Sequence, residues 1–237
     1  SIGDKGGLFL VGTAQSADGS DAVRLNGRQV VYRLSDGDKM LYAEFLPFTA
    51  EDSLSVAETF VDVPARGWVA DAVAFVVSRG LFNGTAPDRF SPDAEMTRGM
   101  LAAVLYNAAG KPETQSARSF SDVSETAYYA DAVRWAAGCG IAAGYEDGSF
   151  RPETAVTREQ LVTMLYRYAG SPDVSDTSDT ALAFSDAGSV SGYAEGAVRY
   201  AVGAGLLAGR NDGRLDPQGT ATRAETAALL MRSLKTV

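Results

Sequence analysis

The sequence predicts a mainly α-helical protein that consists of three tandem helix-turn-helix repeats preceded by a small β segment. The first observation is an internal repeat: Phe60-Val-Asp62-Val recurs as Phe120-Ser-Asp122-Val and as Phe184-Ser-Asp186-Ala. Thr97-Arg98 likewise recurs as Thr157-Arg158 and Thr222-Arg223, and the copies follow at intervals of 60 and then 64 or 65 residues. The second observation is helical periodicity of apolar residues between these motifs, and the third is a β-type alternation confined to the N-terminus. A fixed period of this length indicates stacked supersecondary units.

The N-terminal β segment is predicted for residues 1–50, which do not share the repeat. Three stretches there alternate in polarity and are rich in Val, Tyr and Phe: Leu8–Gln15, Val23–Leu34 and Lys39–Phe48. Asn26-Gly27 is a strong signal for a two-residue hairpin turn. Because three strands are only marginally stable alone, we interpret this segment as the C-terminal part of a preceding domain or as a β cap on the first repeat.

The three repeats are expected at residues 58–110, 118–170 and 182–234. Each begins with a helix that has one apolar face. In the first copy this helix is expected over Val69–Arg79, and Gly80 follows it as a left-handed C-terminal cap. A turn and a short segment that ends in proline, such as Phe90-Ser-Pro92, then lead to a second helix.

The second helix of each repeat is predicted to start at the Thr-Arg pair. Thr157 with Gln160 and Thr222 with Glu225 match the capping box, in which the Thr hydroxyl and the side chain three residues later each accept a hydrogen bond from a backbone amide. Thr97 keeps the cap, but Met100 cannot return the bond. Because one pair of short helices cannot bury its apolar stripes alone, the three copies are expected to pack around a shared core.

Composition excludes several functional classes. The 237 residues include 21 basic and 30 acidic side chains, and the net charge of −9 argues against nucleic acid as a partner. The chain has no His and one Cys, which excludes His-based triads, Cys/His zinc sites and an intrachain disulfide. No run approaches the roughly 18 apolar residues of a membrane span. We therefore expect a non-catalytic protein without metal or cofactor, in which Cys139, between two glycines, is a buried small residue.

Together these motifs resemble the bacterial S-layer homology (SLH) domain, which usually occurs as three tandem copies at one end of exported surface proteins. The resemblance covers about residues 58–234 and rests on the Phe-x-Asp-Val starts, the glycine-containing middle at 144–152 and Thr-Arg-Ala-Glu at 222–225. It implies a pseudo-threefold globule with grooves between neighbouring repeats. It also implies an extracellular location at the bacterial cell wall.

The function implied by the resemblance is noncovalent binding of a secondary cell-wall polysaccharide that carries pyruvate ketals. A ketal presents a carboxylate, which we expect to be favoured by free amides and partial positive charge at a helix start. The arginines at these starts are expected to bind the carboxylate in bidentate fashion, and an aromatic residue before each first helix is expected to stack on sugar rings. The candidate ligand-binding residues are Arg98, Arg158 and Arg223, the aromatic residues Trp68, Tyr128 and Tyr193, and the glycines Gly84, Gly144 and Gly209.

Alternative interpretations exist for these residues and for the function. The alternative for the arginines is a solvated side chain or a salt bridge between repeats, and the alternative for the aromatic residues is packing in the core or at an interface. Because Gly99-Met100 stands where Ala-Glu is typical, we expect the groove of Arg98 to contribute less than those of Arg158 and Arg223. The alternative function is protein–protein self-association in a surface layer, which would proceed without any wall polymer.

Overall fold

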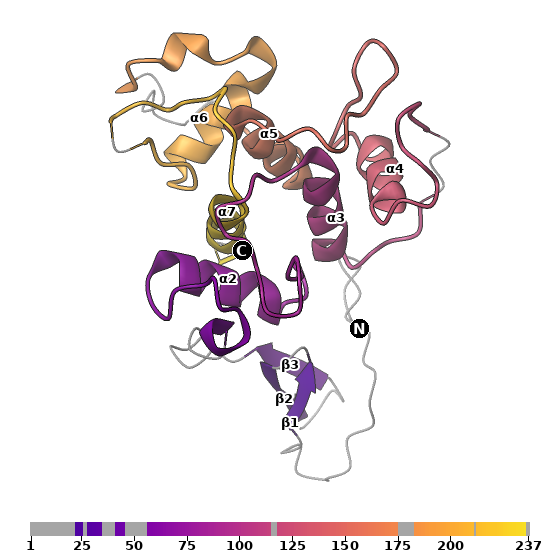
Figure 1. The fold of residues 1–237 in the computed structure, drawn as a ribbon, viewed down its shortest axis with the longest axis vertical. Coiled ribbons are helices and arrows are strands. Elements are labelled where there is room, and N and C mark those ends of the chain that lie inside the picture. The colour runs from indigo at the N-terminus through magenta and orange to yellow at the C-terminus, as the bar shows by residue number, and fades with distance from the viewer. Residues whose placement is uncertain are drawn as a thin grey trace. The chain divides into compact units, whose positions relative to one another are not determined.

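The computed structural model of this chain describes residues 22–25, 28–34, 41–45, 56–114, 118–174, 183–210 and 212–235. The chain forms two compact units, residues 1–90 and residues 91–237. Figure 1 shows the elements in chain order and confirms the prediction of a mainly helical protein. Among the helices in these ranges, none combines the length and the apolar character that crossing a membrane requires.

The first unit contains a three-stranded antiparallel sheet. Its strands β1 (Ala22–Leu25), β2 (Arg28–Leu34) and β3 (Leu41–Phe45) pair in the order β1-β2-β3. Leu25 lies opposite Arg28, so β1 and β2 pair as neighbouring antiparallel strands, as the predicted hairpin requires; the predicted turn residues Asn26-Gly27 lie outside the described residues. The stretch Leu8–Gln15, which we also expected to be extended, lies outside the described residues.

Helix α2 (Trp68–Ser78) is the first helix of the first repeat and lies within one residue of the predicted bounds. Its buried face includes Val73, Phe75 and Val76, none of which is exposed to solvent. Gly80 has a φ of 65°, the left-handed conformation that a residue with a Cβ adopts at a cost. The sequence therefore placed both the helix and its C-terminal end correctly.

The Asp of each start motif holds the loop that leads to the second helix. The Asp122 carboxylate accepts hydrogen bonds from the backbone N–H groups of Phe150 and Arg151, both at 2.7 Å. Asp186 accepts the equivalent bonds in the third repeat, from Leu215 and Asp216 at 2.8 Å. Arg151 has a φ of 57°, which is unfavourable for a residue with a Cβ. The carboxylate thus stabilises a strained residue just before the proline, which explains why the two motifs recur together.

The second unit contains five α-helices within its described residues. These are α3 (Arg98–Ala108), α4 (Ala130–Gly138), α5 (Arg158–Tyr168), α6 (Glu195–Gly203) and α7 (Arg223–Lys235), with short 3₁₀ turns η2 (Ala187–Ser189) and η3 (Gly192–Ala194) before α6. The second helix of one repeat packs against the first helix of the next, as α3 does against α4 and α5 against α6 (Figure 1). Leu101, Leu105 and Leu230 from the second helices are fully buried.

Three short extended segments, one from each repeat, join in a closed ring of backbone hydrogen bonds. The N–H of Met96 donates to the carbonyl of Ala221 at 2.9 Å, that of Ala221 to Val156 at 3.1 Å, and that of Val156 to Met96 at 2.8 Å. These residues are no more than 1% exposed. Each segment donates one bond and accepts one, so the ring forms the centre of a pseudo-threefold arrangement. Because the partners are far apart in the sequence, no repeat can complete this structure by itself.

Candidate functional site

The second helices α3, α5 and α7 begin at the predicted threonine caps. The Thr157 hydroxyl accepts from Gln160 N–H at 3.3 Å, and the Gln160 side chain accepts from Thr157 N–H at the same distance. Glu225 and Thr222 form the same reciprocal pair at 3.0 and 3.1 Å. Thr97 caps α3 through Met100 N–H at 3.2 Å. Both predicted capping boxes are therefore confirmed, and the first repeat keeps only half of one.

The remaining amides at these helix starts are not available to a ligand. Arg98 N–H donates to the Thr154 carbonyl at 3.0 Å and Gly99 N–H to the Pro152 carbonyl at 2.8 Å. The starts of α5 and α7 make the same two bonds, with carbonyls of the third and first repeats respectively. The expectation that free helix-start amides bind a carboxylate is therefore wrong, because each helix start is docked on the loop of a neighbouring repeat.

The three candidate arginines are buried, with 5–6% of each residue exposed. Arg98 donates from Nε to the Phe150 carbonyl at 2.9 Å and from Nη2 to the Ala143 carbonyl at 3.0 Å. Arg158 makes the equivalent bonds in the next repeat, to Leu215 at 3.0 Å and to Ala208 at 2.7 Å. Burial lowers the pKa of both guanidinium groups, yet arginine stays protonated in proteins. Each of these two side chains therefore connects two repeats and still carries its charge.

The three candidate aromatic residues are exposed. The exposed fractions are 54% for Trp68, 71% for Tyr128 and 54% for Tyr193, so the alternative that they belong to the core is wrong. Exposed flat rings are suited to stack on sugars, whereas most large apolar side chains of the described residues are buried.

The glycines Gly84, Gly144 and Gly209 stand where the Phe ring of each start motif approaches the backbone. A Cβ on Gly144 would lie 2.9 Å from the Ser149 carbonyl oxygen and closer still to Cε1 of Phe120. A Cβ on Gly84 would lie 2.7 Å from Cε1 of Phe60. Close packing alone therefore requires glycine at these positions, and a ligand-binding role for them stays a prediction.

One pocket unites candidate residues from all three repeats. Arg98 comes from the first repeat, Gly144 from the second and Tyr193 from the third, and the pocket has a volume of about 290 Å³. This volume lies at the lower end of the range of roughly 300–1,000 Å³ for small-molecule pockets. One face of α5 completes the lining with Gln160, Thr163, Met164 and Arg167. The other candidate residues, Arg158, Arg223, Trp68, Tyr128, Gly84 and Gly209, do not line it.

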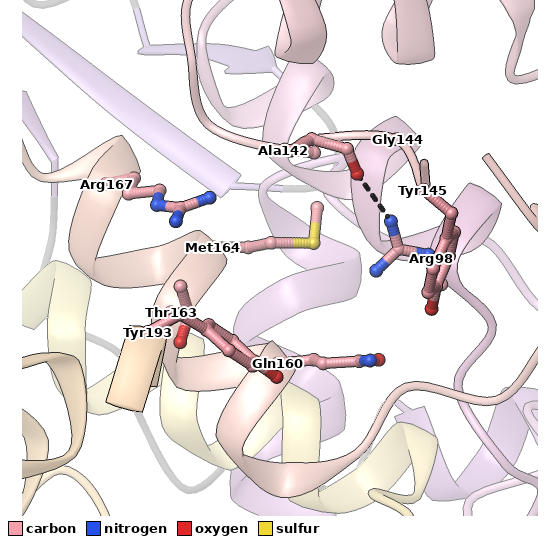
Figure 2. Close-up of a pocket in the computed structure, with 10 residues that line it drawn as sticks. Arg98, Ala142, Gly144, Tyr145, Gln160, Thr163, Met164, Arg167 and Tyr193 are labelled. Carbon is pink, nitrogen blue, oxygen red and sulfur yellow. Dashed lines mark hydrogen bonds between the residues drawn. The ribbon is translucent and has the colours of Figure 1, made fainter. Parts of the chain in front are cut away.

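The charged side chains that line this pocket, Arg98 and Arg167, are both cations. Figure 2 shows them at opposite ends of the lining with Met164 between them. The Arg98 guanidinium carbon lies 4.7 Å from the Phe150 ring centre and 5.1 Å from that of Tyr145, and these contacts hold it in place. Within the described ranges, neither arginine forms an ion pair with a carboxylate. The side chains that line the pocket therefore carry a net positive charge, which suits an anionic group.

A buried carboxylate fixes Tyr193 at the edge of the pocket. Glu159 is 2% exposed and accepts hydrogen bonds from the Tyr193 hydroxyl at 2.8 Å, from the Ser191 hydroxyl at 2.8 Å and from the Ser191 N–H at 3.0 Å. Burial and the bond to Glu159 raise the pKa of Tyr193. The tyrosine therefore keeps its proton, and the position of its ring is set by the start of α5.

Comparison with known families agrees with the repeats seen in the sequence. The model of the S-layer homology domain matches residues 59–99, 119–162 and 183–227. The chain belongs to the S-layer homology family. Such domains occur in cell-surface and S-layer proteins of bacteria, and this places the chain at the bacterial cell wall or cell surface.

Several proteins that carry S-layer homology domains are similar to this chain. Exoglucanase XynX of Acetivibrio thermocellus is 30% identical over 75% of the chain and 16% of its own length. The cellulosome-anchoring protein of the same organism is 24% identical over 73% of the chain and 38% of its own length. S-layer protein sap of Bacillus anthracis is 27% identical over 76% of the chain and 22% of its own length. The chain thus spans a minor part of each relative and matches the S-layer homology part of the multidomain enzymes.

The sequence-based candidates missed seven residues that line this pocket: Ala142, Ala143, Tyr145, Gln160, Thr163, Met164 and Arg167. Four of them come from α5: Gln160, Thr163, Met164 and Arg167 follow at intervals of three, one and three residues, which places them on one helix face. The signal was therefore present in the helical periodicity, but Thr163 and Met164 are themselves buried, so nothing local told the pocket face apart from the rest of the buried surface of α5. A further correction concerns Cys139, which is exposed rather than buried because it lies just beyond the last buried turn of α4.

Proposed function

We propose that this chain anchors its parent protein to the bacterial cell wall by binding the carboxylate of a pyruvate ketal on a secondary cell-wall polysaccharide. The ketal carboxylate would lie in the pocket between Arg98 and Arg167, and its sugar ring against Tyr193. The observation that carries the proposal is the pocket itself, in which two arginines without a carboxylate partner in the described residues face a space of about 290 Å³.

The chemistry of the lining supports a sugar acid over a simple apolar ligand. Arginine binds carboxylates with charge-assisted hydrogen bonds, and Gln160 and Thr163 supply neutral polar groups for hydroxyls. Tyr193 offers an exposed ring whose position is fixed through Glu159. The relative named as a cellulosome-anchoring protein is consistent with an anchoring function.

The test is a binding assay on purified cell walls from which proteins have been removed. We expect the chain to sediment with untreated walls and to remain in solution after mild acid has removed the ketals. Arg167→Gln should weaken sedimentation, whereas Arg134→Gln should not. Arg134 is a matched control because its charge is already paired with Asp131 at 2.8 Å and it does not line the pocket. Equal binding to acid-treated and untreated walls would overturn the proposal.

A further inference from the structure

The pocket at Arg98, here called the Arg98 groove, has an equivalent set of side chains around Arg158, here called the Arg158 groove, and the two sets differ in charge. In each groove, an arginine at the start of one second helix faces the glycine-containing loop of the next repeat and the second helix of that repeat. Gln160 lies at the third position of the helix in the Arg98 groove, and Glu225 holds the same position in the Arg158 groove. Tyr145 of the first groove is likewise replaced by Arg210 in the second.

In the Arg158 groove, the cations are already paired with protein carboxylates. Arg210 donates from Nη1 to Glu225, from Nε to Asp216 at 3.1 Å and from Nη2 to the Thr220 carbonyl at 3.2 Å. Glu225 also lies 3.8 Å from Nη1 of Arg158. Its side chain is only 25% exposed, so water screens these ion pairs incompletely. The Glu225 carboxylate therefore neutralises the positive charge that an anionic ligand would need.

In the Arg98 groove, no such carboxylate is present among the described residues that line it. Gln160 makes the capping contact to Thr157 with its neutral side chain. Arg167 corresponds to Arg232 of the third repeat, whose guanidinium donates to the Leu206 carbonyl at 3.0 Å. Within the described ranges, the Arg167 side chain forms no hydrogen bond or ion pair. In the Arg158 groove the arginines are thus paired with carboxylates of the protein, whereas in the described part of the Arg98 groove they are not.

We propose that the residue at the third position of the second helix selects which groove binds an anionic sugar. Gln160 leaves the Arg98–Arg167 pocket open to a carboxylate, and Glu225 closes the Arg158 groove with a carboxylate of the protein. This inference rests on the proposed function, because it takes a sugar that carries a pyruvate ketal as the ligand. The preference for one groove is thereby assigned to the difference between the Gln160 amide and the Glu225 carboxylate.

The test exchanges these two residues. Gln160→Glu and Glu225→Gln are nearly isosteric, and either side chain can accept the bond from the threonine N–H, so both capping boxes can persist. Binding is measured by calorimetry with a synthetic methyl hexoside that carries a pyruvate ketal, and the methyl ester of the same ketal serves as the uncharged control. Thermal melts followed by circular dichroism show whether each variant is folded.

We expect Gln160→Glu to weaken binding of the ketal acid at least tenfold, because it introduces a negative charge beside the ligand carboxylate. Gln160→Met, which copies the Met100 of the first repeat, should stay within about threefold of the parent because the pocket remains neutral at this position. Glu225→Gln should add one bound ligand per chain, since Arg158 and Arg210 lose a competing carboxylate. If Glu225→Gln melts early, the comparison of Gln160→Glu with Gln160→Met still decides the proposal.

The outcomes separate this inference from the proposed function. If the parent binds the ketal acid no better than its methyl ester, both proposals are overturned. If the parent prefers the acid and Gln160→Glu retains the full affinity, the proposed function stands and the selection by Gln160 is overturned. Equal losses in Gln160→Glu and Gln160→Met would also overturn it, since charge would then not be the cause.

Discussion

Replacing Gly144 with alanine tests whether packing requires the repeated glycine. The new Cβ would lie 2.9 Å from both Cδ1 of Phe120 and the Ser149 carbonyl oxygen, well inside ordinary van der Waals separation. Phe120 packs against Phe150, with ring centres 5.2 Å apart, and Phe150 is fully buried. The ring therefore cannot move away freely.

Overpacking of this kind costs about 1–3 kcal/mol. For a chain of this length, each kcal/mol lowers Tm by roughly 2–4 °C, so Gly144→Ala is expected to melt roughly 2–12 °C below the parent. The assay is a thermal melt followed by circular dichroism, supported by urea titration. Combining Gly144→Ala with Phe120→Leu should recover part of the loss, because the smaller side chain leaves room for the methyl group.

Gly196→Ala is the matched control. Gly196 lies in the first turn of α6, and the nearest atom to its added Cβ would be the Tyr166 hydroxyl at 4.0 Å. Alanine is favoured over glycine in helices by up to about 1 kcal/mol, so this variant should be as stable as the parent or more stable. If Gly144→Ala also proved as stable as the parent, the contact with Phe120 would not be the reason for glycine, and a role at the ligand would become the better explanation.

Two further predictions concern stability. Tyr129 donates to Glu153 at 2.7 Å, and this bond and burial raise its pKa to about 12. The folded state thus holds the proton more tightly than the unfolded state, so the contribution of Tyr129 to the free energy of unfolding is complete below about pH 10 and is lost as the pH rises through about 12. In urea titrations between these pH values, the free energy of unfolding of Tyr129→Phe should therefore fall less than that of the parent. Identical pH profiles for the two proteins would contradict this reasoning. Leu230→Ala should lower the free energy of unfolding by about 2–5 kcal/mol, because Leu230 is fully buried and its loss leaves a cavity. A decrease below about 0.5 kcal/mol would show that this face of α7 is not packed.

The sequence alone determined the repeat organisation and the local structure of each repeat. The bounds of α2, the left-handed Gly80, the hairpin between β1 and β2 and both capping boxes were predictable. These features depend on residues a few positions apart, whose side chains act on their own backbone. The S-layer homology family was recognisable for the same reason, since its motifs are local and occur in a fixed order.

The tertiary structure decided which candidate residues can meet a ligand. The acceptors of the Arg98 guanidinium lie 45 and 52 residues away in sequence, so no local pattern could show that the arginine is buried or that the helix-start amides are bonded to another repeat. From its motif, Arg98 was expected to be the weakest of the three arginines. The structure instead places it with Arg167 in a pocket without a described carboxylate, while Arg158 faces Glu225. The charge of a groove depends on side chains from different repeats, and only the folded chain brings them together.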